Sequence, residues 1–204
     1  MSIVSFIFVT IKKSDYMSPD SEYTETHENK IYATLDKLGI AYQSLHHPAI
    51  MTMEEGAKIA QKLGCTSCKS LFLTNKQQEY FMLLLPANKK LKTKELAGQI
   101  GSSHLSFASE KAMENLLCTF PGAVSILGLI YDKENKVQLL IDKEILESTY
   151  IGCHPCVNTC SLKIRLEDIL KILLPEISHQ NFNIVSYNPK LRSRTFCKKN
   201  EHLS

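Results

Sequence analysis

The sequence predicts an α/β (α+β) domain in which helices surround a mixed β-sheet. Two observations favour this class. Segments with apolar residues at helical spacing alternate with short apolar runs of strand length along the 204 residues. Two helices come first, and further helices then separate the strands, an order typical of a mixed sheet with helices around it. A chain of this length can also bury one sizeable core.

Two helices are expected near the N-terminus. Apolar residues within 31–38 recur at helical spacing, and Gly39 follows where a C-terminal cap belongs. Residues 52–55, Thr-Met-Glu-Glu, form a capping box, in which the threonine and the last glutamate each bind the other's backbone N–H. The helix that begins there is expected to run to about Leu63, because Gly64 lies just beyond.

The middle of the chain is expected to contain a hairpin followed by two helices. Residues 70–74 and 80–85 are apolar runs joined by a polar turn, which predicts two paired strands. Residues 92–100 are expected to form a helix that a glycine ends. A short strand over 104–108 then precedes a helix over 109–117, whose first residue is a good serine N-cap.

The second half of the chain is expected to begin with another hairpin. Residues 124–131 and 137–141 are predicted to pair as strands around a polar turn. A short helix near 143–147 then leads to a loop at Gly152. Two elements complete the domain: a strand over 159–164 and a helix over 166–174 that Pro175 stops.

Composition and charge suggest three regions. We expect a loose leader over residues 1–25, the folded domain over 26–185 and a disordered basic tail over 186–204. The net charge is +3, but residues 189–204 carry five basic residues and one acidic residue, so the remainder is about −1. A near-neutral body does not suit a general nucleic-acid binder, which would show a broad basic face. Such a body could still bind one end of an RNA.

The overall composition suits a cytoplasmic protein. The chain is 44% hydrophobic and 22% charged, and no apolar run approaches the roughly 20 residues that cross a bilayer. Seven cysteines, an odd number, fit reduced thiols better than a disulfide framework. We therefore expect a cytoplasmic protein that does not enter the membrane.

Two cysteine pairs, Cys65-x-x-Cys68 and Cys153-x-x-Cys156, imitate a four-thiolate zinc site. Cysteines are also common small buried hydrophobes, and nothing else in the chain resembles a zinc ribbon. We expect packing residues and neither a metal nor another cofactor. A zinc-stabilised adaptor stays open as an alternative that metal analysis would decide.

The strongest functional signal is a small polar cluster. In Gly152-Cys153-His154-Pro155, glycine permits a turn and proline stiffens it, so the histidine is displayed on a rigid loop. Far upstream, Lys69 opens an apolar strand. On composition alone, the lysine would be a solvated strand end and the histidine a hydrogen-bonded loop residue. Motifs for phosphoryl transfer and for serine-type acyl transfer are absent from the sequence.

From residue 46 to residue 174 the chain resembles the YbaK/ProX superfamily of aminoacyl-tRNA editing domains. The match is specific to the branch of free-standing prolyl-tRNA editing proteins, because the Gly-Gly-x-Ser-Pro loop of the cysteinyl-specific branch is absent. The motifs occur in family order: His47-Pro48 with Thr52-x-Glu54-Glu55, Lys69-Ser-Leu-Phe-Leu73, Leu105-Ser-Phe-Ala-Ser109, Pro121-Gly-Ala-Val124, Gly128-Leu-Ile-Tyr-Asp132 and His154-Pro155-x-x-Asn158-Thr159.

The resemblance implies a partly barrel-like mixed sheet surrounded by helices. It also implies hydrolysis of mischarged alanyl-tRNA(Pro) without a cofactor, at the tRNA acceptor end, with prolyl-tRNA synthetase as a candidate partner. Lys69 and His154 would be catalytic, with Lys69 on the terminal nucleotide and His154 on the aminoacyl group. The expected substrate-binding residues are Gly152, Pro155, Asn158, His47, Thr52 and Ser106.

Selectivity would come from size, since alanine is smaller than proline. Binding alone discriminates small apolar groups by only about 1–3 kcal/mol, which is why hydrolytic editing exists. We expect a cavity lined by Lys69, His154, Asn158 and the 47–52 turn, only large enough for a small side chain. The alternatives are a deacylase for mischarged cysteine or serine, and a non-catalytic tRNA-end binding or regulatory protein of the same fold.

Overall fold

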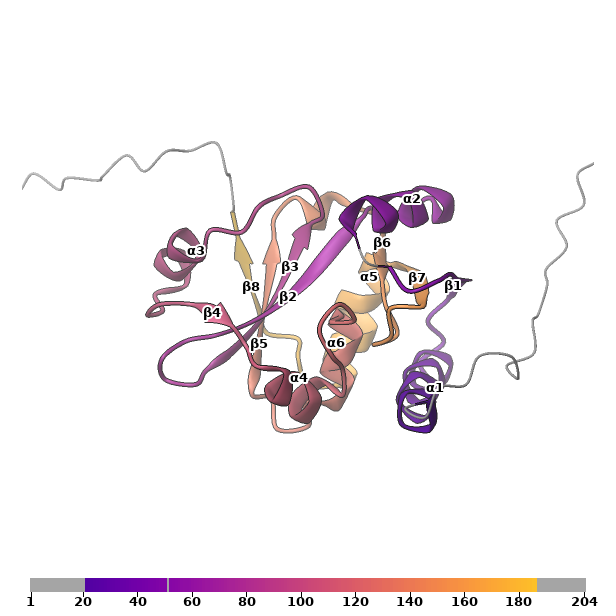
Figure 1. Cartoon of the computed structure of the whole chain (residues 1–204), viewed down its shortest axis with the longest axis horizontal. Coiled ribbons are helices and arrows are strands. Elements are labelled where there is room, and N and C mark those ends of the chain that lie inside the picture. Colours follow the sequence, from indigo (N-terminus) through magenta and orange to yellow (C-terminus); the bar gives the residue numbers. More distant parts are fainter. Residues whose placement is uncertain (1–20, 51, 187–204) are drawn as a thin grey trace, which may run out of the picture.

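The architecture is a mixed α/β arrangement of two sheets with helices around them (Figure 1). A computed structural model describes residues 21–50 and 52–186, with side chains from residue 27 onward. Most of the expected leader and nearly all of the expected basic tail lie outside the described residues. The first helix, α1 (Ser21–Lys37), includes residues 21–25, which the sequence interpretation assigned to the leader.

The larger sheet has five strands in the order β4-β2-β3-β5-β8. The predicted hairpin of β2 and β3 is confirmed as an antiparallel pair, while β5 and β8 extend the sheet in parallel. Parallel neighbours demand crossovers, and the segments between β3, β5 and β8 supply them. The strands are β2 (Cys68–Thr74), β3 (Tyr80–Pro86), β4 (Ser106–Phe107), β5 (Val137–Asp142) and β8 (Phe182–Val185).

The smaller sheet is antiparallel, in the order β1-β7-β6, with β1 (Tyr42–His46), β6 (Tyr150–Cys153) and β7 (Cys160–Arg165). A single bridge between Thr66 and Ile151 connects this sheet to the chain just before β2. The described residues thus form two joined sheets and no closed barrel. This corrects the expectation of one partly barrel-like sheet, while the mixed strand directions are as expected.

The predicted helix caps are present. Thr52 and Glu55 form the capping box of α2 (Met53–Leu63), and Gly64 ends that helix in the left-handed region with φ 64°. Gly101 ends α3 (Thr93–Ile100) in the same way. The Ser109 side chain accepts a hydrogen bond from the backbone N–H of Ala112 and begins α4 (Glu110–Leu117).

The predicted hairpin over 124–131 and 137–141 is wrong. Its first half is a 3-10 helix, η2 (Ile126–Tyr131), begun by a hydrogen bond from the Leu127 N–H to the Ser125 side chain. Its second half, β5, pairs in parallel with β3 instead. Residues 126–130 are all buried, and a short segment buried on every side has no periodicity that separates helix from strand.

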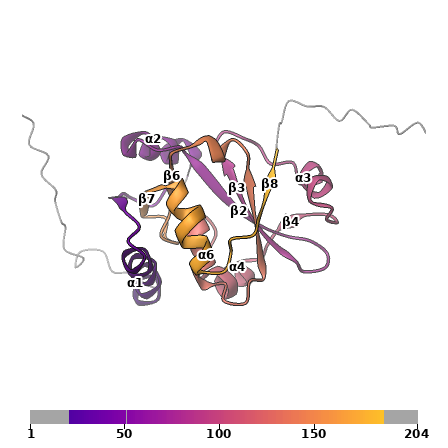
Figure 2. The ribbon, with the colours of Figure 1, turned by 180° about the vertical axis from the view of Figure 1, so that it is seen from behind.

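Pro175 does not stop the last helix, contrary to the expectation. Residues 166–176 are continuously helical: α5 (Leu166–Asp168), a π-helical stretch η4 (Ile169–Leu173) and α6 (Leu174–Glu176). Within the widened stretch, the Leu174 N–H donates to the Ile169 carbonyl five residues back, and Pro175, which lacks an N–H, lies just after it. Seen from behind, this segment lies between β7 and β8 (Figure 2).

Three further differences affect the smaller elements. Strands β1 and β8 were not predicted, and the strand expected over 104–108 is reduced to two residues. Gly152 lies within β6, so the loop begins only at His154. The short helix expected near 143–147 is a 3-10 turn, η3 (Ile145–Glu147).

The core explains why β3 is an unbroken apolar run. Met82 and Leu84 pack into the larger cluster with α1, α4 and η2, while Phe81, Leu83 and Leu85 pack on the opposite face against α3. A strand buried on both faces needs no polar alternation. Among the described helices, none combines the length and apolar character that a membrane crossing requires.

Candidate active site

A cavity of about 680 Å³ lies where the two sheets meet. Helix α2, the beginning of β2, the β4–α4 segment and the β6–β7 connection all contribute to its walls. Four of the predicted site residues line it: Lys69, His154, Gly152 and Thr52. Residues far apart in the sequence therefore converge on one cavity, although their catalytic and binding roles stay predictions.

Lys69 reaches across the start of the β2–β3 pair. Its Nζ donates to the carbonyl of Ala87 at 3.1 Å and to that of Lys89 at 2.6 Å. An ammonium has three donors, so these two bonds leave one for a ligand in the cavity. Burial lowers the pKa of the Lys69 ammonium. The lysine is thus a held, partly desolvated cation rather than a solvated strand end.

His154 is held in one tautomer by the backbone. Its Nδ1 lies 2.9 Å from the Cys160 carbonyl oxygen, which can only accept, so Nδ1 carries the proton. Burial lowers the His154 pKa; the bond to the Cys160 carbonyl acts in the opposite direction, and the electrostatic influence of His47 adds a smaller lowering of this pKa. A neutral His154 then presents an unprotonated Nε2, which can accept a proton or a hydrogen bond.

Gly152 is required by close packing rather than by a turn. Its φ is outside the left-handed region, and its N–H donates to the Thr66 carbonyl at 3.0 Å. A Cβ added to Gly152 would lie 3.2 Å from the Cys65 Sγ, tighter than ordinary contact. The Cys68 thiol donates to the Gly152 carbonyl at 2.9 Å. The glycine turn expected from the sequence is therefore wrong, because Gly152 lies within β6 and leaves room for the Cys65 sulfur.

His47 lies beside the cavity without lining it. Its Nδ1 donates to the Pro48 carbonyl at 2.9 Å, so its Nε2 accepts the Ser161 hydroxyl at 2.9 Å. Ser161 itself lines the cavity and is buried. Ser161 was not predicted as a site residue, because it is one of three polar residues in the six-residue strand β7 and nothing local sets it apart.

Three other predicted binding residues are not among those that line the cavity. Pro155 is buried, and the Asn158 carbonyl accepts the Ile50 N–H at 3.2 Å, which ties the two loops together. Ser106 lies on β4 opposite Thr74 and is exposed. We infer that the first two shape the loop around His154, while Ser106 has no contact that supports a role in binding.

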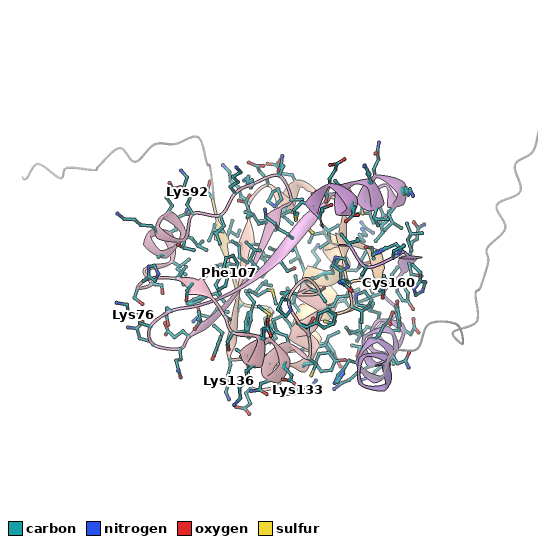
Figure 3. The ribbon with its side chains drawn as sticks, viewed as in Figure 1. Lys76, Lys92, Phe107, Lys133, Lys136 and Cys160 are labelled. Atoms are coloured by element: carbon teal, nitrogen blue, oxygen red, sulfur yellow. The ribbon has the colours of Figure 1, made fainter. Side chains whose placement is uncertain are left out.

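Phe107, the neighbour of Ser106, lines the cavity where Ser106 does not. It is labelled in Figure 3 and follows Ser106 on β4, so its side chain leaves the strand on the opposite side. Phe107 is 62% exposed. Met53, the first residue of α2, also lines the cavity and is 52% exposed. Exposed apolar surface gathered at a cavity is typical of a ligand-binding groove. Both were missed, because an apolar residue in a sequence is first assigned to the core.

The cysteine pairs pack against the site instead of meeting as a cluster. All six described cysteines are free thiols. Burial raises the pKa of Cys68 and that of Cys156 to about 12, which disfavours the thiolate form that binds metals. Within residues 21–50 and 52–186, no group of three or more His, Cys, Asp or Glu is placed to hold a metal ion.

The cavity is much larger than the small-side-chain pocket expected from the sequence. At about 680 Å³ it falls within the range of sites for drug-sized ligands, and residues of both α2 and α4 line it. The cavity is larger than expected because it includes the rim formed by Met53 and Phe107. Its volume has room for a nucleotide in addition to a small amino acid.

Comparison with known proteins identifies the class. The sequence profile of the aminoacyl-tRNA editing domain family matches residues 47–172, the same part of the chain that carries the site. The protein belongs to this family. It is therefore an aminoacyl-tRNA editing protein, and its reaction class is hydrolysis of the ester between an amino acid and tRNA.

Particular relatives narrow the comparison. The prolyl-tRNA editing protein ProX of Acetoanaerobium sticklandii is 32% identical over 144 residues, which cover 70% of this chain and 88% of that protein. The prolyl-tRNA synthetase associated domain-containing protein 1 of Danio rerio is 30% identical over 141 residues, 68% of this chain and 77% of its own. The crystal structure of a candidate trans-editing enzyme for prolyl tRNA synthetase shares the fold, with a TM-score of 0.60 and 14% identity over 84% of this chain and 98% of that chain.

Proposed function

We propose that this protein hydrolyses the ester of alanyl-tRNA(Pro), a mischarged tRNA, as a free-standing editing enzyme. The observation that carries the proposal is that Lys69 and His154 line one cavity. One ester bond must be reached from its ribose side and from its aminoacyl side at the same time. The similarity to a protein named as a prolyl-tRNA editing protein supports the choice of tRNA(Pro).

The chemistry requires positioning and charge stabilisation more than a protein nucleophile. Water adds to the ester carbonyl carbon, the carbon–oxygen bond to the ribose breaks, and the ribose oxygen takes up a proton. Lys69 would place a cation beside the terminal nucleotide and the developing negative charge. The neutral Nε2 of His154 would accept a hydrogen bond from the aminoacyl group or from the attacking water.

The rim suits the terminal nucleotide. Phe107 offers an exposed aromatic face, and Met53 offers a second apolar surface. Base stacking on an aromatic side chain is worth about 1–3 kcal/mol and tolerates any base. With the nucleotide held at this rim, the remaining inner space near Gly152 would admit the methyl group of alanine more easily than the ring of proline.

The partners follow from the substrate. The proposed ligand is the acceptor end of tRNA(Pro), and prolyl-tRNA synthetase, which produces the mischarged tRNA, is the proposed protein partner. The relatives named after a synthetase-associated domain support this link. The free cysteines support a cytoplasmic location, where such tRNAs are charged.

Deacylation of alanyl-tRNA(Pro) by the purified full-length chain tests the proposal. Ester loss should exceed the spontaneous rate in the same buffer at catalytic amounts of protein. Binding of the tRNA without any excess ester loss would instead favour the non-catalytic alternative. Loss of cysteinyl or seryl esters in place of the alanyl ester would move the specificity to another mischarged amino acid.

A further inference from the structure

The turn after β3 holds the Lys69 ammonium through two backbone carbonyls. Ala87 and Lys89 supply these carbonyls, and the Ala87 N–H in turn donates to the Ser67 carbonyl at 3.0 Å. The position of Lys69 therefore depends on a turn of residues 86–89 rather than on its own strand alone.

A buried ion pair between Lys89 and Asp142 anchors this turn. The Lys89 side chain is 8% exposed, and its Nζ lies 2.8 Å and 2.9 Å from the two oxygens of Asp142, whose side chain is 0% exposed. Glu144 adds a second carboxylate at 2.9 Å but is half exposed. Asp142 also accepts the Glu144 N–H at 3.0 Å, so the carboxylate is well satisfied.

Asp142 is held by the central part of the larger sheet. It ends β5, which lies between β3 and β8 in the five-stranded sheet, and it pairs with Val185. A continuous path thus runs from the Asp142 carboxylate to the Lys89 ammonium, through the Lys89 side chain to its backbone carbonyl, and on to the Lys69 ammonium. The path joins the centre of the sheet to the cavity wall.

Stability alone explains this pair poorly. Taking two charges out of water is costly, and apolar residues of similar size often stabilise a protein as well or better. What an apolar pair cannot do is fix the direction in which a backbone carbonyl points. We propose that Lys89 and Asp142 are positioning residues that hold the turn of residues 86–89 so that Lys69 faces the substrate, an inference that rests on the proposed function.

The decisive variant replaces both charges with apolar groups, Lys89→Met with Asp142→Leu. The core stays filled, and Glu144 is exposed enough to be solvated, so the double variant should fold. Deacylation of alanyl-tRNA(Pro) should nonetheless fall about 100-fold, because a displacement of about 1 Å in a catalytic group can have that effect. Glu134→Gln is the matched control, since it removes the exposed ion pair with Lys136 and should leave the rate unchanged.

A double-mutant cycle separates positioning from any other effect. In a Lys69→Ala background, measured with excess enzyme, the apolar pair should cause no further loss, because the group that it positions is already gone. An equal loss in both backgrounds, or a wild-type rate in the apolar double variant, would overturn the proposal.

A spectroscopic measurement does not depend on activity. In the wild type, the two Hε protons of a fixed Lys69 should give separate NMR signals, assigned by their disappearance in Lys69→Ala. They should merge in the Lys89→Met/Asp142→Leu variant and stay separate in Glu134→Gln. If the wild type fails to deacylate alanyl-tRNA(Pro), the proposed function fails, yet these signals still decide whether the buried pair positions Lys69. Unchanged, separate signals in the apolar variant contradict it.

Discussion

Two side chains at the cavity have their chemistry set by backbone carbonyls. The carbonyls of Ala87 and Lys89 take two donors of Lys69, and the carbonyl of Cys160 takes the Nδ1 proton of His154. The result is an oriented cation and a neutral acceptor that line the same cavity. Both properties can be tested one residue at a time.

Replacement of Lys69 by alanine should reduce deacylation of alanyl-tRNA(Pro) by about 100- to 1000-fold, the usual loss for one donor aimed at developing charge. The fold should survive, since Lys69 is only half-buried and lies at a strand end. Steady-state rates and a thermal melt measure the two effects. Lys94→Ala, which removes an exposed lysine from α3, is the control. A wild-type rate for Lys69→Ala would show that the assigned role is wrong.

Activity should depend on pH through His154. Because burial holds its pKa below the ordinary 6.5, the required neutral form persists as the pH falls to that value. The kcat/KM for alanyl-tRNA(Pro) should therefore stay level from neutral pH down to 6.5 and decline only below it. The decline should be absent from the residual activity of His154→Gln. A rise on acidification would indicate that the protonated form acts instead.

At the scale of elements, β6 lies so close to the segment after α2 that a side chain at position 152 would crowd the Cys65 sulfur. Gly152→Ala should lower the free energy of unfolding by about 1–3 kcal/mol, because the new methyl group meets the Cys65 sulfur. Urea denaturation measures this. Adding Cys65→Ala should recover part of the loss, while Gly98→Ala, on α3 with open space around it, should stabilise by up to about 1 kcal/mol. Additive effects at positions 152 and 65 would contradict the contact.

Asp132, in the turn before β5, should make the free energy of unfolding depend on pH. Burial raises the Asp132 pKa, but hydrogen bonds from His179 and from the Val137 and Lys136 N–H groups outweigh it, so the net pKa lies below the ordinary 3.8. A depressed folded pKa means that this stabilisation is present above about pH 5 and is lost as the pH falls through 3.8 and below.

Unfolding free energies of the wild type and of Asp132→Asn at a series of pH values measure this contribution. The variant should be less stable near pH 6, by about 1–3 kcal/mol if a buried N–H loses its partner. The difference between the two proteins should shrink towards pH 3. A difference that stays constant with pH would exclude the charge of Asp132 as its source.

Elements with local signals could be predicted from the sequence. The capping box of Thr52 and Glu55, the terminal Gly64 and the Ser109 cap act within four or five residues, so their motifs suffice. The 126–131 segment could not, because its burial by distant elements decides its conformation. The expectation for Pro175 was wrong for a related reason. The π-helical stretch before it accommodates the backbone N–H that proline lacks.

For the molecule as a whole, the cavity exists only because the two sheets meet at the Thr66–Ile151 bridge. The sequence could indicate Lys69 and His154 through their motifs. Phe107 also lies in a family motif, but its apolar side chain carried no functional signal, and Ser161 lies in no motif. The register of their strands brings both residues to the cavity. Asn158 belongs to the His154 motif and Ser106 to the motif of residues 105–109, yet neither is among the residues that line the cavity. Three-dimensional packing, which no local pattern reveals, decides these cases.

The most direct test of the proposed function compares esters on one tRNA. Alanyl-, cysteinyl-, seryl- and prolyl-tRNA(Pro) should be incubated separately with the full-length protein, and kcat/KM for ester loss measured for each. Alanyl-tRNA(Pro) should be hydrolysed fastest, at about 100-fold or more above prolyl-tRNA(Pro), since discrimination by size in a pocket reaches about this range. Equal rates for the alanyl and prolyl esters, or no loss of the alanyl ester above the spontaneous rate, would contradict it.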